Sequence, residues 1–310
     1  MIYTVTLNPA IDLIVNSELN LGELNRANSE EYFIGGKGIH VSEMVRELGE
    51  ETVATGFAAG FTGDFLKQEL DRKGIPHHFV GAEGITRVNV KVLSAEGPMT
   101  ELNLTGIRVN KARMNELNRY LENHITPDDV VVLSGNSAEG VSLDDFIDLC
   151  RTVSGKTEKL VVDASLEKIT ASLPFKPWLV RPSVFELYDA GSRRLSYEDD
   201  MTEAGKRLCA QGAKNVLIRD VAKATILVSE DGVYFGDPLD VPVVSSIGAM
   251  DALVSGFIVK YKETHDYAKA LEWAIAAATA TSATYDLATK KEIEEMLDEV
   301  YVTPAGGTKR

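Results

Sequence analysis

Short runs of β-branched and other apolar residues alternate along the chain with longer stretches in which apolar residues recur every three or four positions. The first pattern is typical of buried strands, and the second is typical of helices with one buried face. We expect strands at residues 2–7, 52–56, 130–133, 160–162, 178–180 and 216–218. We expect helices at residues 38–48, 65–73, 111–122, 143–153 and 202–211. This alternation predicts an α/β fold, in which helices cover both faces of a parallel sheet.

Two regions interrupt the alternation. Residues 11–34 contain two apolar runs without a helix between them, and residues 87–104 resemble a hairpin around Glu96-Gly97-Pro98. We therefore expect residues 11–34 and 86–105 to form a small separate β-sheet, here called the lid, over one end of a large domain. Residues 1–10, 35–85 and 106–303 would form the large domain. Its last part, 251–262, 267–285 and 290–300, has helical periodicity, and residues 304–310 are expected to be a flexible tail.

Composition and charge limit the classes of partner. The chain has 310 residues with 32 Lys and Arg against 47 Asp and Glu, a formal net charge of −15. Nucleic acids and anionic membranes attract basic proteins, so this balance argues against both as partners. No apolar run approaches the roughly 18 residues of a membrane span. The two cysteines suggest neither a disulfide framework nor a zinc site, and the N-terminus lacks a signal-peptide pattern, so we expect a cytoplasmic protein.

Two motifs suggest chemistry. Gly35-Gly36-Lys37-Gly38 precedes a helix, where glycines let backbone N–H groups approach an anion and the lysine adds a charge. The same residues are also compatible with a flexible connection between the lid and the large domain. Gly248-Ala249-Met250-Asp251 opens another helix. Its carboxylate is interpreted either as a helix cap or as a general base beside N–H groups that stabilise a transferring phosphoryl group.

Taken together, several segments resemble the PfkB (ribokinase-like) carbohydrate kinases in order and spacing over nearly the whole chain. They are Thr6-Leu7-Asn8-Pro9-Ala10-Ile11-Asp12, residues 35–41, residues 86–91, Thr100-Glu101-Leu102-Asn103, Ser134-Gly135 and residues 248–251. Within the family, the first and fourth segments look most like 1-phosphofructokinases, with tagatose-6-phosphate kinases as close relatives. The resemblance implies a ribokinase-like three-layer αβα sandwich with a β-sheet lid. It also implies Mg²⁺-dependent transfer of a phosphoryl group from ATP to a primary hydroxyl of a ketose phosphate, in the first place fructose 1-phosphate.

The resemblance also assigns roles to individual residues. For the sugar phosphate they are the lid carboxylate Asp12, the loop residues Gly35, Gly36, Lys37, Gly38 and His40, and the lid residues Arg87 and Asn89. For catalysis they are the base Asp251 and the anion-hole residues Gly248, Ala249 and Met250. For the nucleotide they are Arg219, Lys223, Ala224 and Ala278, with Glu186 acting indirectly on the magnesium and phosphates. Lys91 would either add positive charge or be a solvated lid residue, and Lys223 would either contact a phosphate or be solvated.

Departures from the family pattern lie mostly on the nucleotide side. Met250 replaces a glycine, and it would cost about 1–3 kcal/mol if that glycine has a positive φ. The nucleotide loop at residues 219–225 has lost every glycine, Ser183 replaces an asparagine near the magnesium and phosphate site, and His40 replaces an asparagine beside the sugar. Two alternatives to the main prediction therefore stay open: a tagatose-6-phosphate kinase, and a weakened kinase-fold protein that binds sugar phosphate. Relatives that dimerise through the lid suggest a homodimer as well.

Overall fold

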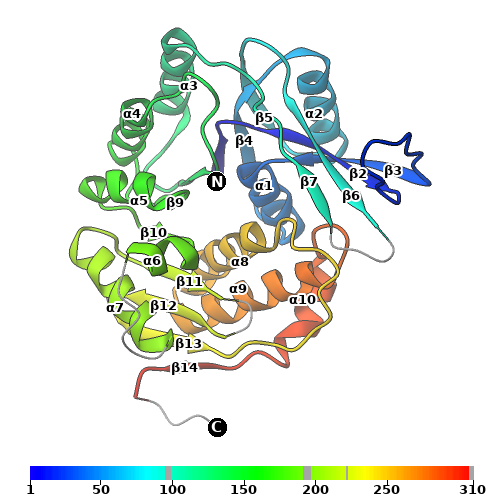
Figure 1. Cartoon of the computed structure of the whole chain (residues 1–310). Coiled ribbons are helices and arrows are strands. Elements are labelled where there is room, and N and C mark those ends of the chain that lie inside the picture. The colour runs from blue at the N-terminus through cyan, green and yellow to red at the C-terminus, as the bar shows by residue number, and fades with distance from the viewer. Residues whose placement is uncertain (95–98, 191–196, 221–222, 307–310) are drawn as a thin grey trace.

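The apolar runs of the chain form the centre of a large mixed sheet (Figure 1). The computed structural model describes residues 1–94, 99–190, 197–220 and 223–306. The order of strands in the sheet is β14-β13-β12-β11-β10-β9-β8-β1-β4-β5. In chain order these strands are β1 (Ile2–Thr6), β4 (Thr52–Ala58), β5 (His77–Gly81), β8 (Val130–Ser134), β9 (Leu160–Asp163), β10 (Leu179–Val180), β11 (Val216–Arg219), β12 (Thr225–Ser229), β13 (Gly232–Gly236) and β14 (Val302–Pro304).

The parallel sheet expected from the sequence forms only part of this sheet. Strands from β5 to β11 pair in parallel, whereas β12, β13 and β14 extend the sheet with antiparallel pairs. The expected strands omitted β5 and β12–β14. Strands β5, β13 and β14 are short and half-buried, so their apolar pattern is weak. Strand β12 is buried and has a clear apolar run, so its omission from the expected strands is an error.

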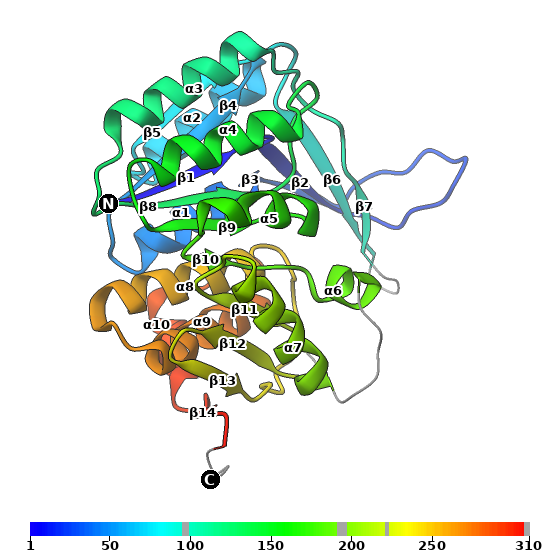
Figure 2. The same cartoon turned by 90° about the vertical axis from the view of Figure 1, so that its left-hand side faces the viewer.

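Helices pack on both faces of the sheet, which confirms the αβα sandwich (Figure 2). They are α1 (Lys37–Glu47), α2 (Gly60–Arg72), α3 (Lys111–His124), α4 (Leu143–Ser154), α5 (Leu166–Ser172), α6 (Val184–Ala190), α7 (Tyr197–Ala210), α8 (Ala249–Thr264), α9 (Tyr267–Ser282) and α10 (Lys290–Leu297). One core joins the sheet to α3, α4, α5 and α7, and the other joins it to α1, α8, α9 and α10. Gly256 lets helices α8 and α9 approach closely. A Cβ atom at this position would lie only 2.6 Å from the carbonyl oxygen of Trp273.

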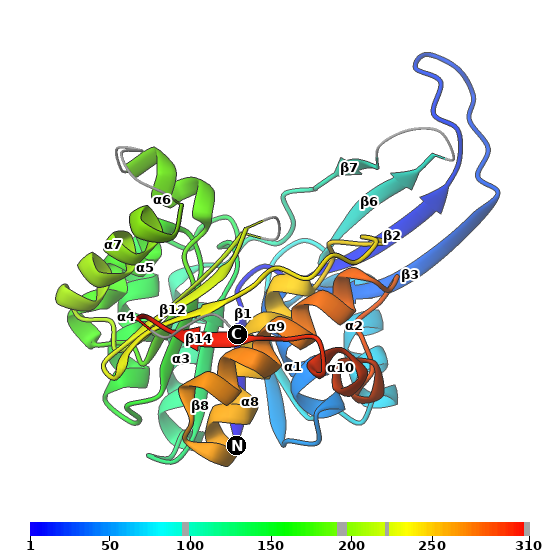
Figure 3. The same cartoon turned by 90° about the horizontal axis from the view of Figure 1, so that it is seen from below.

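Four other strands form a second sheet that projects from the large domain (Figure 3). They are β2 (Ala10–Asn16), β3 (Ser29–Gly35), β6 (Arg87–Leu93) and β7 (Thr100–Leu102), in the order β3-β2-β6-β7. Parallel pairing of β2 with β6 places Asp12 beside Asn89. The turn at Glu96-Gly97-Pro98 lies outside the described residues.

The end of the chain differs from the expected tail. Pro304 is the last residue of β14, which pairs with β13, so the flexible tail cannot begin at residue 304. Residues 307–310 lie outside the described part of the chain. No helix in the parts of the chain that the structure describes has both the length and the apolar composition needed to cross a membrane.

Candidate active site

A cavity of about 330 Å³ lies where the lid meets the large domain. Two helices begin at it, since the N-cap residues Gly36 of α1 and Gly248 of α8 both line the cavity. Helix N-termini present unpaired N–H groups that favour an anion. The other lining residues are Thr6, Asn8, Asp12, Lys37, His40, Arg87, Lys91, Glu101, Asn103, Ser134, Gly135, Asn136, Ser246, Ile247 and Asp251.

The glycines before α1 permit close packing against β1 and the lid. Gly36 has a φ of 119°, and a Cβ atom there would lie 2.8 Å from Cγ2 of Thr6. A Cβ atom on Gly38 would collide with the hydroxyl of Thr6, and one on Gly35 would lie 2.9 Å from Oδ2 of Asp12. Residues 35–38 are therefore a tightly packed segment and not a loose connection.

The lid contributes a buried carboxylate with two donors. Asp12 is 5% exposed, and it accepts hydrogen bonds from Asn89 Nδ2 at 2.9 Å and from Lys91 Nζ at 3.0 Å. Lys91 is itself buried, so the interpretation of Lys91 as a solvated lid residue is wrong. Its ammonium group neutralises Asp12 and fixes the orientation of that carboxylate at the cavity wall.

Arg87, also on the lid, keeps a charge that no carboxylate neutralises within the described residues. Its Nη atoms donate to the carbonyl oxygens of Leu104 and Asn8, both at 3.3 Å, while its Nε has no partner. Burial lowers the pKa of Arg87 from its usual value, against the opposing effect of the Asp12 charge. A half-buried guanidinium of this kind is well suited to an anionic ligand.

Other polar atoms at the cavity are buried and lack partners. They are the hydroxyl oxygens of Thr6 and Ser134 and Oδ1 of Asn8. Buried polar atoms are normally hydrogen-bonded, and leaving one unpaired costs about 1–3 kcal/mol. A ligand rich in hydroxyl groups would satisfy these atoms.

Asp251 lies in the first turn of α8 and is 5% exposed. Its Oδ2 is 2.8 Å from Nδ1 of His40, which is on α1. Burial alone would lower the pKa of His40, but the hydrogen bond and charge of Asp251, with smaller effects from Glu43 and Asp12, raise it to about 9. The side chain of Asp251 thus pairs with an imidazolium across two helices, which does not match the capping interpretation.

Lys37 belongs to a second group of charged side chains, which includes Asp163 and Arg181. Lys37 Nζ is 3.2 Å from Oδ1 of the fully buried Asp163, which Arg181 also binds. Burial would raise the pKa of Asp163, but Arg181 and Lys37 hold it below its ordinary value. Lys168 donates to the carbonyl oxygen of Gly135, and burial together with Lys37 lowers the pKa of Lys168 to about 8.

The residues expected on the nucleotide side lie away from this cavity, on β11, in the loop between β11 and β12, and on α9. Arg219 donates to Thr279 Oγ1 at 3.0 Å, its Nε has no partner, and burial lowers its pKa to about 10. Ala224 and Ala278 are buried. Lys223 lies over the rings of Tyr188 and Tyr197, so it is not simply solvated.

The described residues contain no cluster of three or more metal-ligating side chains. Glu186 on α6, which the resemblance linked to magnesium, accepts a hydrogen bond from the backbone N–H of Leu166 at 3.0 Å. It therefore caps the start of α5. The magnesium ion that the resemblance implies would be held in large part by the phosphates of ATP.

The structure does not support the expected strain at Met250. The left-handed residue is Gly248, with a φ of 71°, whereas Met250 is the second residue of α8 and has no positive φ. Its half-buried side chain packs against the core formed with α8 and α9 and does not line the cavity. The glycine of the family motif is not conformationally required at position 250.

Met250→Gly is accordingly expected to lower the free energy of unfolding by about 1–3 kcal/mol, because it removes a packed side chain and adds a flexible residue to a helix. Urea denaturation would measure this loss. Lys206→Gly, at an exposed position of α7, reports the cost of helix propensity alone. A gain in turnover without loss of stability in Met250→Gly would reinstate strain at this position.

Several lining residues had received no role from the sequence. They are Thr6, Asn8, Glu101, Asn103, Ser134, Gly135, Asn136, Ser246 and Ile247. Most of them belong to the short segments that carried the family resemblance, so that signal was present. Asp163, Arg181 and Lys168 gave no signal of their own, because only the fold brings them behind Lys37.

Comparisons with known proteins agree with this geometry. The family model described as "pfkB family carbohydrate kinase" matches residues 4–293. The 1-phosphofructokinases of Borreliella burgdorferi and Bacillus subtilis are each 30% identical to the chain, over 97% and 98% of it and 98% and 99% of their own lengths. A crystal structure of a putative phosphofructokinase from Staphylococcus aureus superposes with a TM-score of 0.87 at 30% identity, covering 98% of both chains. The chain therefore belongs to the pfkB family of carbohydrate kinases, and it is a sugar-phosphate kinase.

Proposed function

We propose that this kinase transfers the γ-phosphoryl group of Mg-ATP to a primary hydroxyl of a ketose phosphate, converting fructose 1-phosphate to fructose 1,6-bisphosphate. The observation that carries the proposal is one cavity with an unneutralised Arg87 on its lid side and Asp251 at a helix N-terminus on its other side. A sugar phosphate has both features that such a cavity would bind: an anion, and hydroxyl groups, one of which reacts.

At the sugar end, Arg87 binds the phosphate of the substrate, and Lys37 adds a second positive charge at the cavity wall. Asp12, held by Asn89 and Lys91, accepts hydrogen bonds from sugar hydroxyls. Thr6, Asn8 and Ser134 offer their unpaired polar atoms to the same ligand. Contacts of this kind fix the sugar, so that one hydroxyl faces α8.

At the transfer end, Asp251 accepts the proton of that hydroxyl as its oxygen bonds to the γ-phosphorus and the bond to the leaving ADP breaks. The backbone N–H groups of Gly248, Ala249 and Met250 at the start of α8 stabilise the negative charge on the transferring group. These groups act from fixed positions, which is the main contribution of a protein to phosphoryl transfer.

ATP binds on the side of β11, β12 and α9, where we place Arg219, Lys223, Ala224 and Ala278. Magnesium arrives as part of Mg-ATP, and Glu186 acts on it only indirectly. The glycine-free loop at residues 219–225 is the argument for the alternative, a kinase-fold protein that binds sugar phosphate and turns it over slowly.

The test is a kinase assay with Mg-ATP and either fructose 1-phosphate or tagatose 6-phosphate. We expect turnover with fructose 1-phosphate to exceed that with tagatose 6-phosphate, and Asp251→Asn to lower kcat at least ~100-fold, the usual scale for loss of a general base. Binding of either sugar phosphate without turnover would instead support the slow or binding-protein alternative. Near-normal turnover in Asp251→Asn would remove this residue from the role of base.

Arg87→Ala is expected to raise the KM for the sugar phosphate about 10- to 150-fold, because a hydrogen bond between charged groups contributes roughly 1.5–3 kcal/mol. The KM for ATP should change little, since ATP binds at the other end of the site. Steady-state kinetics with each substrate varied in turn would measure both values. Arg108→Ala, which removes an exposed arginine paired with Glu139, serves as the control. Equal weakening of both substrates would contradict the placement of Arg87.

We also propose that two copies of the chain associate through their lids. The segment that joins β2 to β3 exposes Leu21 and Leu24, and the lid strands expose Tyr32 and Leu102. Apolar side chains grouped in this way are typical of a protein interface. Light scattering should give twice the mass of one chain, and the double variant Leu21→Asp with Leu24→Asp should give a single chain mass. A monomeric unmodified protein would contradict the proposal.

A further inference from the structure

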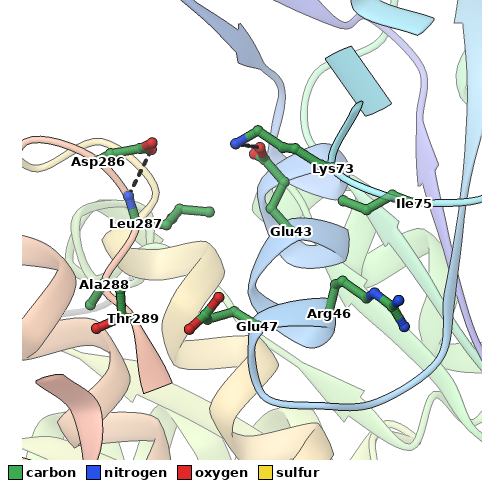
Figure 4. A pocket seen from close by; sticks show the side chains of 9 residues that line it. All are labelled: Glu43, Arg46, Glu47, Lys73, Ile75, Asp286, Leu287, Ala288 and Thr289. Atoms are coloured by element: carbon green, nitrogen blue, oxygen red, sulfur yellow. Dashed lines mark hydrogen bonds and ion pairs between the residues drawn. The ribbon is translucent and has the colours of Figure 1, made fainter. Parts of the chain in front are cut away.

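His40 stands between the cavity and a second ion pair. It is buried on α1, where its Nδ1 contacts Oδ2 of Asp251. One turn further along α1, Glu43 pairs at 2.5 Å with Lys73, the C-cap residue that follows α2 (Figure 4). Four alternating charges thus run from Asp251 through His40 and Glu43 to Lys73. The family asparagine at position 40 would interrupt this series, because it carries no charge.

We propose that His40 is the positioning residue of Asp251: its imidazolium holds one carboxylate oxygen, leaves the other for the substrate hydroxyl, and neutralises the carboxylate where an anionic substrate must bind. This inference rests on the proposed function, in which Asp251 is the base. His40 was expected to contact the sugar; it lines the cavity, and it also has a charged partner, Asp251, on α8.

The geometry explains how one oxygen is selected. Nδ1 of His40 binds Oδ2 of Asp251. Among the described residues, the side chain of Asp251 has no other hydrogen-bond partner. Oδ1 of Asp251 is therefore open to a ligand in the cavity that both residues line.

The pair makes the site sensitive to alkaline pH. The pKa of His40 is raised to about 9, so its positive charge is present below that pH and is lost as the pH rises through it. Above this pH the pair has a net charge of −1 and repels anionic substrates, an effect of about tenfold for a charge about 12 Å away at an effective dielectric constant near 20. Phosphate groups, with a second pKa near 6, do not titrate in this range.

Other charged groups surround His40 and contribute to the pH dependence of the site. Asp251 on α8, Glu43 on α1 and Asp12 on β2 act on it directly, and burial opposes them. The remaining charged or titratable residues of the adjoining cavities are Lys37, Arg87, Lys91, Glu101, Tyr285 and Asp286. Lys168, with a pKa near 8, titrates nearby, and its ionisation is common to every variant proposed below.

The test compares the pH dependence of kcat/KM for fructose 1-phosphate, from pH 7 to 10, in four proteins. The unmodified protein should lose about tenfold through a step near pH 9, and His40→Asn should lack this step. Glu43→Gln, which lies outside the cavity, should move the step to lower pH, because it removes a negative charge beside His40. His124→Asn, at an exposed histidine, is the matched control and should keep the step.

A second measurement needs no turnover. The ¹³C resonances of the five histidine rings in the unliganded full-length protein would be titrated, with His40 assigned by the signal lost in His40→Asn. A midpoint near pH 9 that falls by more than one unit in Asp251→Asn supports the pairing. A midpoint below 7, or a step near pH 9 that persists in His40→Asn, overturns the inference. Absence of turnover in the unmodified protein at every pH would contradict the proposed function instead.

Discussion

The close approach of α1 to β1 is the constraint on which the rest of the site depends. Glycines at 36 and 38 let the start of α1 press against Thr6, at the carboxyl end of β1. This contact sets the depth of α1, and through α1 it sets the positions of Lys37 and His40. Helix α8 packs against the same helix, so that Asp251 meets His40 across the interface. A side chain at either glycine would separate these elements.

Charge pairing is the second principle of the site. The chain has a net charge of −15, yet each buried carboxylate described at the cavity has a cation: Lys91 for Asp12, Arg181 and Lys37 for Asp163, and His40 for Asp251. Pairing keeps the acidic groups ionised while it limits the cost of burying them. Arg87, by contrast, has no carboxylate partner among the described residues, and its charge makes the lid side of the cavity attractive to an anion within an acidic protein.

The sugar and nucleotide ends differ in how far they keep the family pattern. At the proposed sugar end, Asp12, Gly36, Lys37, His40 and Arg87 line one cavity. After β11, the loop has no glycine, and the half-buried Arg219 donates a hydrogen bond to Thr279. Met250 shows that a residue that departs from the family motif need not strain the backbone. The left-handed position in that motif is Gly248, where glycine is retained, so a larger residue two positions later fits an ordinary helix.

The sequence by itself determined the αβα class, the lid strands and several of the residues that line one cavity, because periodicity and short motifs are local properties of a chain. It did not identify the antiparallel edge β12–β14: β13 and β14 are half-buried and carry a weak apolar pattern, whereas the buried strand β12 was missed despite its apolar run. Nor could it show that His40 pairs with Asp251, that Lys91 is buried against Asp12, or that Met250 is unstrained. Those features depend on contacts between residues as many as 211 positions apart and on backbone angles, and only the tertiary structure fixes either of them.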